Sequence, residues 1–315
     1  MQKKRRLLSG PTCLLILSVI TGCRCLRNSG AVSMNERNAW EDIPQDKIVL
    51  IVNGDDVGID PVFTDATLDA CLKRKISSAS ILTPGPDADR AIALWKEHPE
   101  LDIGIHFCLT GRWEPLTSGA SLRNENGLMW DTSEEAARHV KPEEAAVEWE
   151  AQIKKVVDAG VSFSHIDSHM GCYFLSRALL MAAYNLAVKY RVLLISGFIP
   201  GQMPSSLRGF FPFSSYTGIY TLGNDEETLE NRTAAYWQLL GKLQPGIHYL
   251  FSHQGLEPPD KSISGDLGLR INDYKFWTSE ATHAELAARG IVMISCALLK
   301  KGLRQALQYA DFTVP

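Results

Sequence analysis

The chain has few of the features that mark membrane, disordered or disulfide-rich proteins. No apolar run approaches the roughly 20 residues that a bilayer-spanning helix needs. No long polar or low-complexity tract predicts disorder. The 7 cysteines lack the CxxC spacing of zinc modules, and we predict no disulfide framework from them. These absences indicate that the chain is a globular protein.

The composition is ordinary for a folded domain: 45% of the 315 residues are hydrophobic and 22% are charged. A chain of this length can bury most of its apolar surface without disulfide staples. Length alone fits one large domain or two small ones. Because no repeat or linker divides residues 46–315, we expect a single domain there.

The first 22 residues are typical of a bacterial export signal. Four basic residues at 3–6 precede an apolar stretch of signal-peptide length. The stretch ends in Ile-Thr-Gly-Cys at 20–23, which is similar to a lipobox. We therefore expect residues 1–22 to be a lipoprotein signal peptide, Cys23 to carry lipid and residues 23–45 to form a tether. A secretory signal cut at another position is the alternative.

Such a protein would lie on the periplasmic or extracellular side and contact the membrane through its lipid alone. Each buried lipid methylene contributes roughly 0.8 kcal/mol to that attachment. The signal carries four basic residues and no acidic ones, so its removal takes the formal net charge from -4 to -8. A mildly acidic protein is a poor candidate for binding nucleic acid.

Short β-branched runs alternate with segments of helical spacing from residue 47 onward. Such alternation predicts a parallel sheet covered by helices, either open or closed into a barrel. Three polar stretches at 110–132, 197–224 and 254–272 lack a period, and connections this long are usually functional. The predicted strands lie at 47–53, 78–82, 101–107, 161–166, 192–196, 247–251 and 291–295. The predicted helices lie at 61–73, 86–97, 142–159, 175–190, 226–243 and 273–288.

Polar residues cluster where four of these strands end, which is where active sites form in parallel α/β proteins. Asp55 and Asp56 follow the first strand, and adjacent carboxylates there are costly unless a cation compensates them. Neighbours on an extended backbone point opposite ways, so one can bind metal while the other faces substrate. A solvated turn or a helix cap is the alternative.

Histidines mark the other three strand ends. His106 lies in an apolar run, where a hydrogen-bonded core histidine is the alternative to a metal ligand. His165, Asp167 and His169 share one face if their strand continues, and His169 can bind metal while Asp167 or His165 orients it. A polar turn is the alternative for residues 165–169. At the fourth strand end, His253 taken alone is a weak signal of a functional site. Together, one aspartate and two histidines with an open position are typical of a catalytic zinc site.

Four motifs in this order resemble the YdjC-like, or chitooligosaccharide deacetylase, family. They are Asn-Gly-Asp-Asp-Val-Gly at 53–58, Gly-Ile-His-Phe-Cys-Leu-Thr at 104–110, His-Ile-Asp-Ser-His at 165–169 and His-Gln-Gly at 253–255. The resemblance covers residues 47–296. It implies an α/β fold, a distorted (β/α) barrel of about seven parallel strands similar to a TIM barrel.

The resemblance also implies a reaction and a set of roles. Asp56, His106 and His169 would hold one divalent metal ion, zinc or magnesium. Asp55 would act as general base, and His253 as acid or oxyanion stabiliser. The substrate would be an N-acetylated amino sugar or oligosaccharide, and the products acetate and a free amine.

The chain departs from the family pattern at several positions. Gly54 and Val57 replace Ala and Phe, Gly171 stands where many members have a histidine, and Gln254 replaces Pro. Arg270 is a further candidate for orienting the site or binding substrate. Arg270 and Asp273 can also bind each other, and a structural role is favoured for Asp273. Aromatic residues of the long loops can stack on sugar rings or simply pack on the barrel. They are Trp113, Trp130, Phe210, Phe211 and Tyr216.

Two other functions remain open from the sequence. One is a different metal-dependent hydrolase on the same barrel, such as an amidase or a phosphoesterase. The other is a non-catalytic glycan-binding lipoprotein. An intact Asp55 speaks against the second, because binding alone needs no base beside the metal.

Overall fold

The computed structural model describes residues 46–196, 213–219, 228–258 and 265–301. The predicted signal segment, Cys23 and the tether lie outside these residues, so export and lipid anchoring stay predictions. Within the described part, no helix is both long and apolar enough to cross a bilayer.

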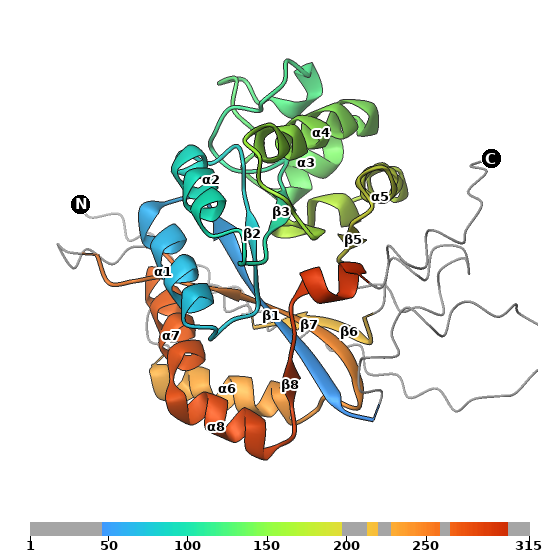
Figure 1. Ribbon diagram of the computed structural model, residues 1–315. Helices are drawn as coiled ribbons and strands as arrows, with labels where there is room; N and C mark the ends of the chain where they lie inside the picture. The colour runs from blue at the N-terminus through green and yellow to red at the C-terminus, as the bar shows by residue number, and fades with distance from the viewer. Residues whose placement is uncertain (1–45, 197–212, 220–227, 259–264, 302–315) are drawn as a thin grey trace, which may run out of the picture.

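The described strands form one parallel sheet, ordered β5-β4-β3-β2-β1-β7-β6, with β8 paired to β1. The sheet curls, and no pairing joins its end strands β5 and β6 within the described residues, so that it forms an incomplete barrel (Figure 1). The α/β barrel prediction is therefore confirmed. The strands are Ile48–Val57 (β1), Ser78–Ile81 (β2), Gly104–Phe107 (β3), His165–Ser168 (β4), Leu193–Leu194 (β5), Ser215–Gly218 (β6), Gly246–His253 (β7) and Val292–Met293 (β8).

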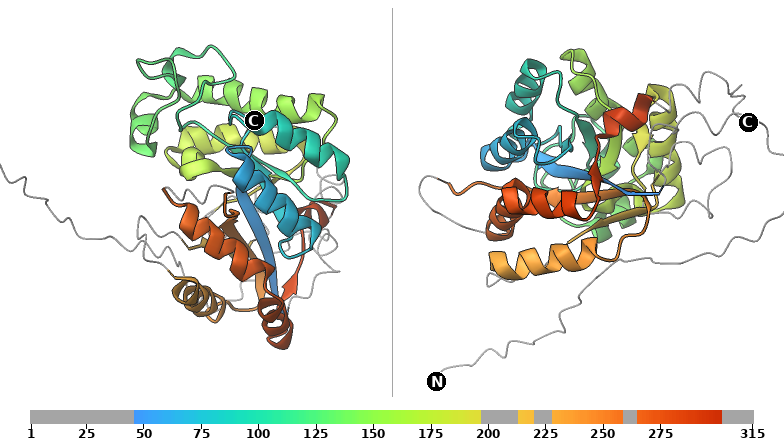
Figure 2. Two further views of the ribbon diagram at one scale, coloured as in Figure 1. Left: turned by 90° about the vertical axis from the view of Figure 1, so that its left-hand side faces the viewer. Right: turned by 60° about the horizontal axis from the view of Figure 1, so that its bottom comes forward.

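The helices pack around the outside of this curved sheet, as the two turned views show (Figure 2). They are Pro61–Leu72 (α1), Ala88–Glu97 (α2), Ser133–His139 (α3), Pro142–Asp158 (α4), Arg177–Tyr190 (α5), Leu229–Leu240 (α6), Leu267–Thr278 (α7) and Glu280–Ala288 (α8). Short 3-10 helices lie at Ala120–Leu122 (η1) and His169–Phe174 (η2).

Strand β1 has three partner strands in the sheet and contributes a fully buried run to the core. It pairs with β7 along one edge, and with β8 and then β2 along the other. Its apolar run Val49 to Val52 is completely buried, as a strand covered on both faces requires. Each such side chain contributes roughly 1.5–3 kcal/mol on burial. On the far side of the sheet, Trp149 of α4 stacks on Phe107 of β3 with ring centroids 4.9 Å apart.

Local sequence signals account for several helix ends. Asp60 caps α1 by accepting a hydrogen bond from the Val62 N–H at 2.8 Å, and Pro61 occupies the first helical position. Thr132 and Glu135 form a capping box that starts α3. That helix was not predicted, because its few apolar positions show no clear period.

Three further predictions of secondary structure need correction. The segment expected to be one helix from 273 to 288 is two helices, α7 and α8, separated by the extended backbone of Ser279. Helix α7 also begins at Leu267, within the stretch predicted to be a loop. Strand β6 lies inside the second predicted loop, where aromatic residues pack it against β7.

The departure at Gly54 has a packing explanation. A Cβ atom at this position would lie 2.6 Å from Cγ2 of Thr67 and 3.0 Å from Cδ1 of Ile76. Thr67 is a β-branched residue of α1 with little freedom to move away. In this chain the Thr67 methyl group therefore fills the space that an alanine at position 54 would occupy.

We predict that Gly54→Ala lowers the free energy of unfolding by about 1–3 kcal/mol through overpacking. Adding Thr67→Ala should recover most of that loss, because it removes the clashing methyl group and a hydroxyl that has no partner among the described residues. Chemical denaturation of the two single variants and the double variant measures the coupling. Strictly additive effects would contradict this explanation.

Candidate metal centre and active site

The predicted site residues meet at the carboxyl ends of the parallel strands. Asp55 and Asp56 lie near the end of β1, His106 lies in β3, and His253 ends β7. His169 directly follows β4 and opens η2, where Met170 and Gly171 both adopt positive φ angles. Parallel strands bring these ends to a single edge of the sheet. Residues more than 100 positions apart in sequence are thus brought into contact.

A β-bulge turns both carboxylates of β1 toward the same imidazole. Gly54 pairs with Ala79 and Val57 with Ile81, so three steps along β1 oppose two along β2. Asp56 has a φ of 68°, a left-handed conformation that residues other than glycine rarely adopt.

The bulge overturns the expectation that the two aspartates point to opposite sides. An Oδ2 atom of Asp55 lies 4.0 Å from Nε2 of His106, and Oδ1 of Asp56 lies 3.4 Å from the same nitrogen. Strained backbone of this kind persists where the surrounding structure enforces it, often at functional sites.

Asp56, His106 and His169 form a group whose donor atoms all lie within 4.8 Å of one another. Oδ1 of Asp56 is 3.4 Å from Nε2 of His106 and 3.0 Å from Nδ1 of His169. Ligands about 2.0–2.1 Å from a tetrahedral zinc ion are about 3.3 Å apart, so these separations fit one cation. A carboxylate and two imidazoles leave a further position for water or substrate.

Asp167 orients His106. Its Oδ1 lies 2.8 Å from Nδ1 of His106, which leaves Nε2 of that ring facing Asp56. A carboxylate behind a histidine in this way fixes the ring and its tautomer. The sequence interpretation had Asp167 or His165 behind His169. In the structure His165 instead contacts Ser164 and Tyr249.

Asn53 and Tyr249 hold the carboxylates in place, and the sequence reasoning missed both. The Asn53 amide donates to Oδ1 of Asp55 at 2.7 Å and to Oδ2 of Asp167 at 3.3 Å. The Tyr249 hydroxyl donates to Oδ2 of Asp167 at 2.9 Å. Both lie within buried strand runs; Asn53 also opens the first family motif, and Tyr249 has no sequence signal beyond its place in the strand.

The two oxygen atoms of Asp56 have different partners, because Arg270 binds only one of them. Its Nη2 donates to Oδ2 of Asp56 at 2.7 Å, while Oδ1 of Asp56 faces the histidines. The guanidinium is itself held by Asp266, at 2.9 Å from Nε, and lies 4.1 Å from the centroid of the Phe63 ring. Arg270 thus leaves one oxygen of Asp56 for a cation.

Asp273 does not pair with Arg270 and has the structural role that was expected for it. It accepts hydrogen bonds from Nε of Arg232 at 2.5 Å, from the Tyr236 hydroxyl at 2.7 Å and from the His253 backbone N–H at 3.1 Å. These contacts tie the end of β7 to α6 and α7. The position of His253 beside Asp56 therefore depends on Asp273.

The buried charges of the site do not balance. Asp55, Asp56 and Asp167 are each at most 3% exposed, and Arg270 is 8% exposed. With neutral imidazoles these four groups sum to two negative charges, which one divalent cation would neutralise. Because uncompensated buried charge is costly, the charge balance supports a divalent ion.

Protons take over this compensation when no cation is bound. Burial raises the pKa of Asp55 well above its usual range, although His106 opposes the rise. Burial alone would lower the pKa of His106, but Asp167 and Asp55 raise it well above its ordinary value. For Asp56, burial is outweighed by Arg270 and His169, which hold its pKa well below the usual range.

His253 is a neutral imidazole at neutral pH. Burial, followed by the charge of Arg270, lowers its pKa to about 4. Its Nε2 lies 3.8 Å from Oδ2 of Asp56. A neutral ring in this position can donate an N–H group but does not carry a positive charge.

The first long loop, residues 110–132, is held to helix α4 by hydrogen bonds. Glu148 of α4 accepts hydrogen bonds from the Leu116 and Thr117 backbone N–H groups at 3.0 and 2.9 Å. Glu144 accepts from the Ser121 N–H at 2.8 Å. Two carboxylates of one helix therefore fasten residues 116–121.

The aromatic residues predicted to contact sugar have different surroundings. Trp113 lies beside the site, with its ring centroid 6.2 Å from that of His169. Trp130 stacks on His139 and donates to a loop carbonyl, which gives it a structural role. Tyr216 packs on Tyr249. Phe210 and Phe211 lie outside the described residues.

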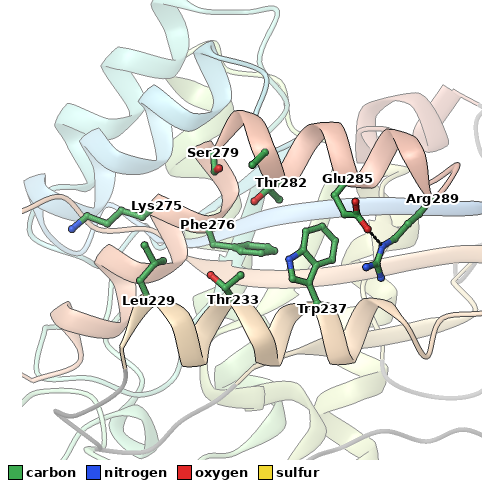
Figure 3. A pocket seen from close by; sticks show the side chains of 10 residues that line it. Leu229, Thr233, Trp237, Lys275, Phe276, Ser279, Thr282, Glu285 and Arg289 are labelled. Atoms are coloured by element: carbon green, nitrogen blue, oxygen red, sulfur yellow. Dashed lines mark hydrogen bonds and ion pairs between the residues drawn. The ribbon is translucent and has the colours of Figure 1, made fainter.

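A separate pocket of about 410 Å³ lies between α6 and the α7–α8 pair (Figure 3). None of the predicted site residues lines it. Its walls include Trp237, whose ring is covered by Arg289 at 4.6 Å. The pocket is lined by residues of these helices and does not belong to the metal centre.

The chain matches the sequence model of YdjC-like proteins over residues 49–288. This range takes in all four strand ends that form the site. The chain belongs to the YdjC-like family.

Its YdjC-like relatives include named enzymes. The chain is 32% identical over 254 residues to carbohydrate deacetylase 1 of Listeria innocua, an alignment that covers 78% of this chain and 98% of the relative. It is 28% identical over 250 residues to a carbohydrate deacetylase of Thermus thermophilus, covering 72% and 84%.

A solved structure also has a similar fold. The crystal structure of an Enterococcus faecalis protein, described as a cellobiose-phosphate cleavage protein, matches with a TM-score of 0.64 and 24% identity. The match covers 79% of this chain and 98% of that one. At this identity the likeness establishes the fold.

We predict that Arg270→Gln lowers the free energy of unfolding of the metal-free protein by about 3–5 kcal/mol, because Asp56 then stays buried without its cationic partner. Lys275→Gln is a matched control, since Lys275 pairs with Glu257 while both side chains are about half exposed. Loss of that exposed pair should cost at most about 1 kcal/mol. Equal effects of the two substitutions would refute the assigned role of Arg270.

The difference between wild type and Arg270→Gln should also depend on pH. The pKa of Asp56 is depressed in the folded state, so the pair stabilises the protein above the ordinary aspartate pKa. This stabilisation is lost as the pH falls through the folded-state pKa. The free energies of unfolding of the two metal-free proteins, measured from neutral to strongly acidic pH, should converge as the pH falls. A difference between them that grows in acid would contradict this prediction.

Proposed function

We propose that this protein is a metal-dependent carbohydrate deacetylase that hydrolyses the N-acetyl group of an amino sugar or oligosaccharide. The observation that carries the proposal is that the donor atoms of Asp56, His106 and His169 lie within 4.8 Å of one another. The carboxylate of Asp55 lies beside the imidazole of His106. The names of the YdjC-like relatives support the substrate class.

The donor set supports zinc or magnesium as the cation. Imidazole ligands suit zinc, whereas carboxylate and water ligands suit magnesium, and this site offers both kinds. A divalent cation held by Asp56, His106 and His169 would polarise the amide carbonyl and lower the pKa of a water molecule. Asp167 and Arg270 would keep His106 and Asp56 oriented toward it.

Asp55 is the proposed general base. Asn53 holds its Oδ1 atom at 2.7 Å, while its Oδ2 atom faces His106. This oxygen would accept a proton from the attacking water as the water oxygen bonds to the carbonyl carbon. When the carbon–nitrogen bond breaks, the same proton would pass to the leaving nitrogen, so that a neutral amine and acetic acid result, and the acid then releases its remaining proton to solvent as acetate.

His253 is the proposed oxyanion stabiliser. Because its pKa is about 4, the ring is neutral at working pH and would donate its N–H group to the developing negative charge. Of the two roles considered for this residue, stabilising the oxyanion therefore has more support than donating a proton. Asp273 would keep the ring in place through the backbone of β7.

Other functions of the same centre make different predictions. An amidase or phosphoesterase acting on other substrates would use the same ligands but would release no acetate from acetylated amino sugars. A glycan-binding protein without activity would gain nothing from Asp55, whose buried carboxylate is costly to keep.

The test is metal analysis of the purified protein together with an acetate-release assay on N-acetylated glucosamine oligomers. We expect a divalent ion bound at the Asp56 centre and turnover that stops on chelation. Absence of acetate from every acetylated amino sugar tested would refute the substrate class.

The Asp55→Asn variant tests the mechanism. Loss of the base should lower kcat by roughly 10²–10⁴-fold while the bound metal is retained, because Asp55 is not assigned as a ligand. Asp89→Asn is the control, since this aspartate is 87% exposed on α2. Unchanged turnover of Asp55→Asn would eliminate the proposed base.

A further inference from the structure

A second group of potential metal ligands lies near the amino-terminal ends of β3 and β4. Asp102 precedes β3, His165 begins β4, and Cys296 follows β8. Their donor atoms all lie within 4.8 Å of one another, the same limit that the Asp56–His106–His169 group satisfies. The two groups share no residue, and Tyr249 lies between them, with its hydroxyl 3.4 Å from Nε2 of His165 and 2.9 Å from Oδ2 of Asp167.

Two of the three potential ligands, Asp102 and His165, are supported by hydrogen bonds that leave another donor atom available. Oδ2 of Asp102 accepts from the Ser78 hydroxyl and from the Ala297 N–H, both at 3.0 Å, which leaves Oδ1. Nδ1 of His165 lies 2.8 Å from the Ser164 hydroxyl, which leaves Nε2 with only a 3.4 Å contact to the Tyr249 hydroxyl. Metal ligands in proteins are commonly held by outer partners of this kind.

The arrangement of the backbone also favours this cluster. A Cβ atom at Gly104 would lie 2.4 Å from Nε2 of His165, so only glycine at that position lets the imidazole lie across the start of β3. His165 and Cys296 are completely buried, and Asp102 is partly exposed. Asp102 therefore offers a route by which an ion can enter.

We propose that Asp102, His165 and Cys296 form a second cation site, for a thiophilic divalent ion such as Zn²⁺. A thiolate ligand distinguishes it from the Asp56 centre, which contains no sulfur. Thiolate and imidazole together select zinc over magnesium or calcium. Three protein ligands leave a fourth tetrahedral position for water.

The ion would act as a structural clamp. Strand β8 pairs only with β1 among the described strands, and the segment after it runs toward β5 (Figure 1). The Ala297 N–H to Asp102 hydrogen bond joins this segment to the chain before β3. A cation shared by Cys296, Asp102 and His165 would fasten the segment to the starts of β3 and β4 and so stabilise the folded state.

Cobalt provides the direct test, because a thiolate bound to Co²⁺ gives an intense charge-transfer absorption and the Asp56 centre cannot. The reduced, metal-free protein is titrated with Co²⁺ and then with Zn²⁺, and bound metal is measured. We expect the charge-transfer band in the wild type, and about two ions per chain when both sites fill. Cys296→Ala should abolish the band and leave about one ion.

Cys172→Ala is the matched control, because Cys172 is also a completely buried free thiol. It should keep the band. His169→Ala should lose the ion of the Asp56 centre and keep the band, so failure of the proposed function and failure of this proposal give different results. If Cys296→Ala does not fold, Asp102→Asn should weaken Co²⁺ binding at the sulfur site by at least tenfold. A wild-type protein that saturates with Co²⁺ without a charge-transfer band would overturn the proposal.

Discussion

Buried negative charge at the carboxyl ends of the strands is the constraint on which the rest of the site depends. Three aspartates lie in a space that water barely reaches, and one arginine compensates only part of their charge. Isolated carboxylates in such a place would take up protons or unfold the region. Every neighbouring polar group can be understood as a response: Asn53 and Tyr249 donate hydrogen bonds, Arg270 donates a charge, and the histidines face the space left for a cation.

The strained backbone of Asp56 is part of the same arrangement. A regular strand would send Asp55 and Asp56 to opposite faces of the sheet. The bulge in β1 brings both carboxylates to His106, and the hydrogen bond from Arg270 holds Asp56 in its left-handed conformation. Helix α7 is therefore as important to the site as the strands are. It supplies Arg270 on one turn and Asp273, which positions β7, on the next.

The parts of the fold that follow from local pattern were predictable. Buried β-branched runs alternating with amphipathic helices indicate a parallel α/β sheet, and the Asp60–Pro61 pair locates the start of α1. Elements held mainly by tertiary contacts were missed or misplaced. Helix α3 is short and has little period, and β6 exists because its aromatic side chains pack on β7. The separation of α7 from α8 depends on one extended residue, Ser279, which no periodicity reveals.

Local patterns in the sequence identify the residue types at the strand ends, the family to which the chain belongs, and the members of the candidate metal centre. How those residues pair follows from the three-dimensional fold. Asp167 lies behind His106 from 61 positions away, and Arg270 reaches Asp56 across 214 positions. Such partners cannot be read from local pattern, because a hydrogen bond between distant segments depends on sheet register and on the bulge in β1. Register and bulge are set by packing of the whole barrel, which no short stretch of sequence contains.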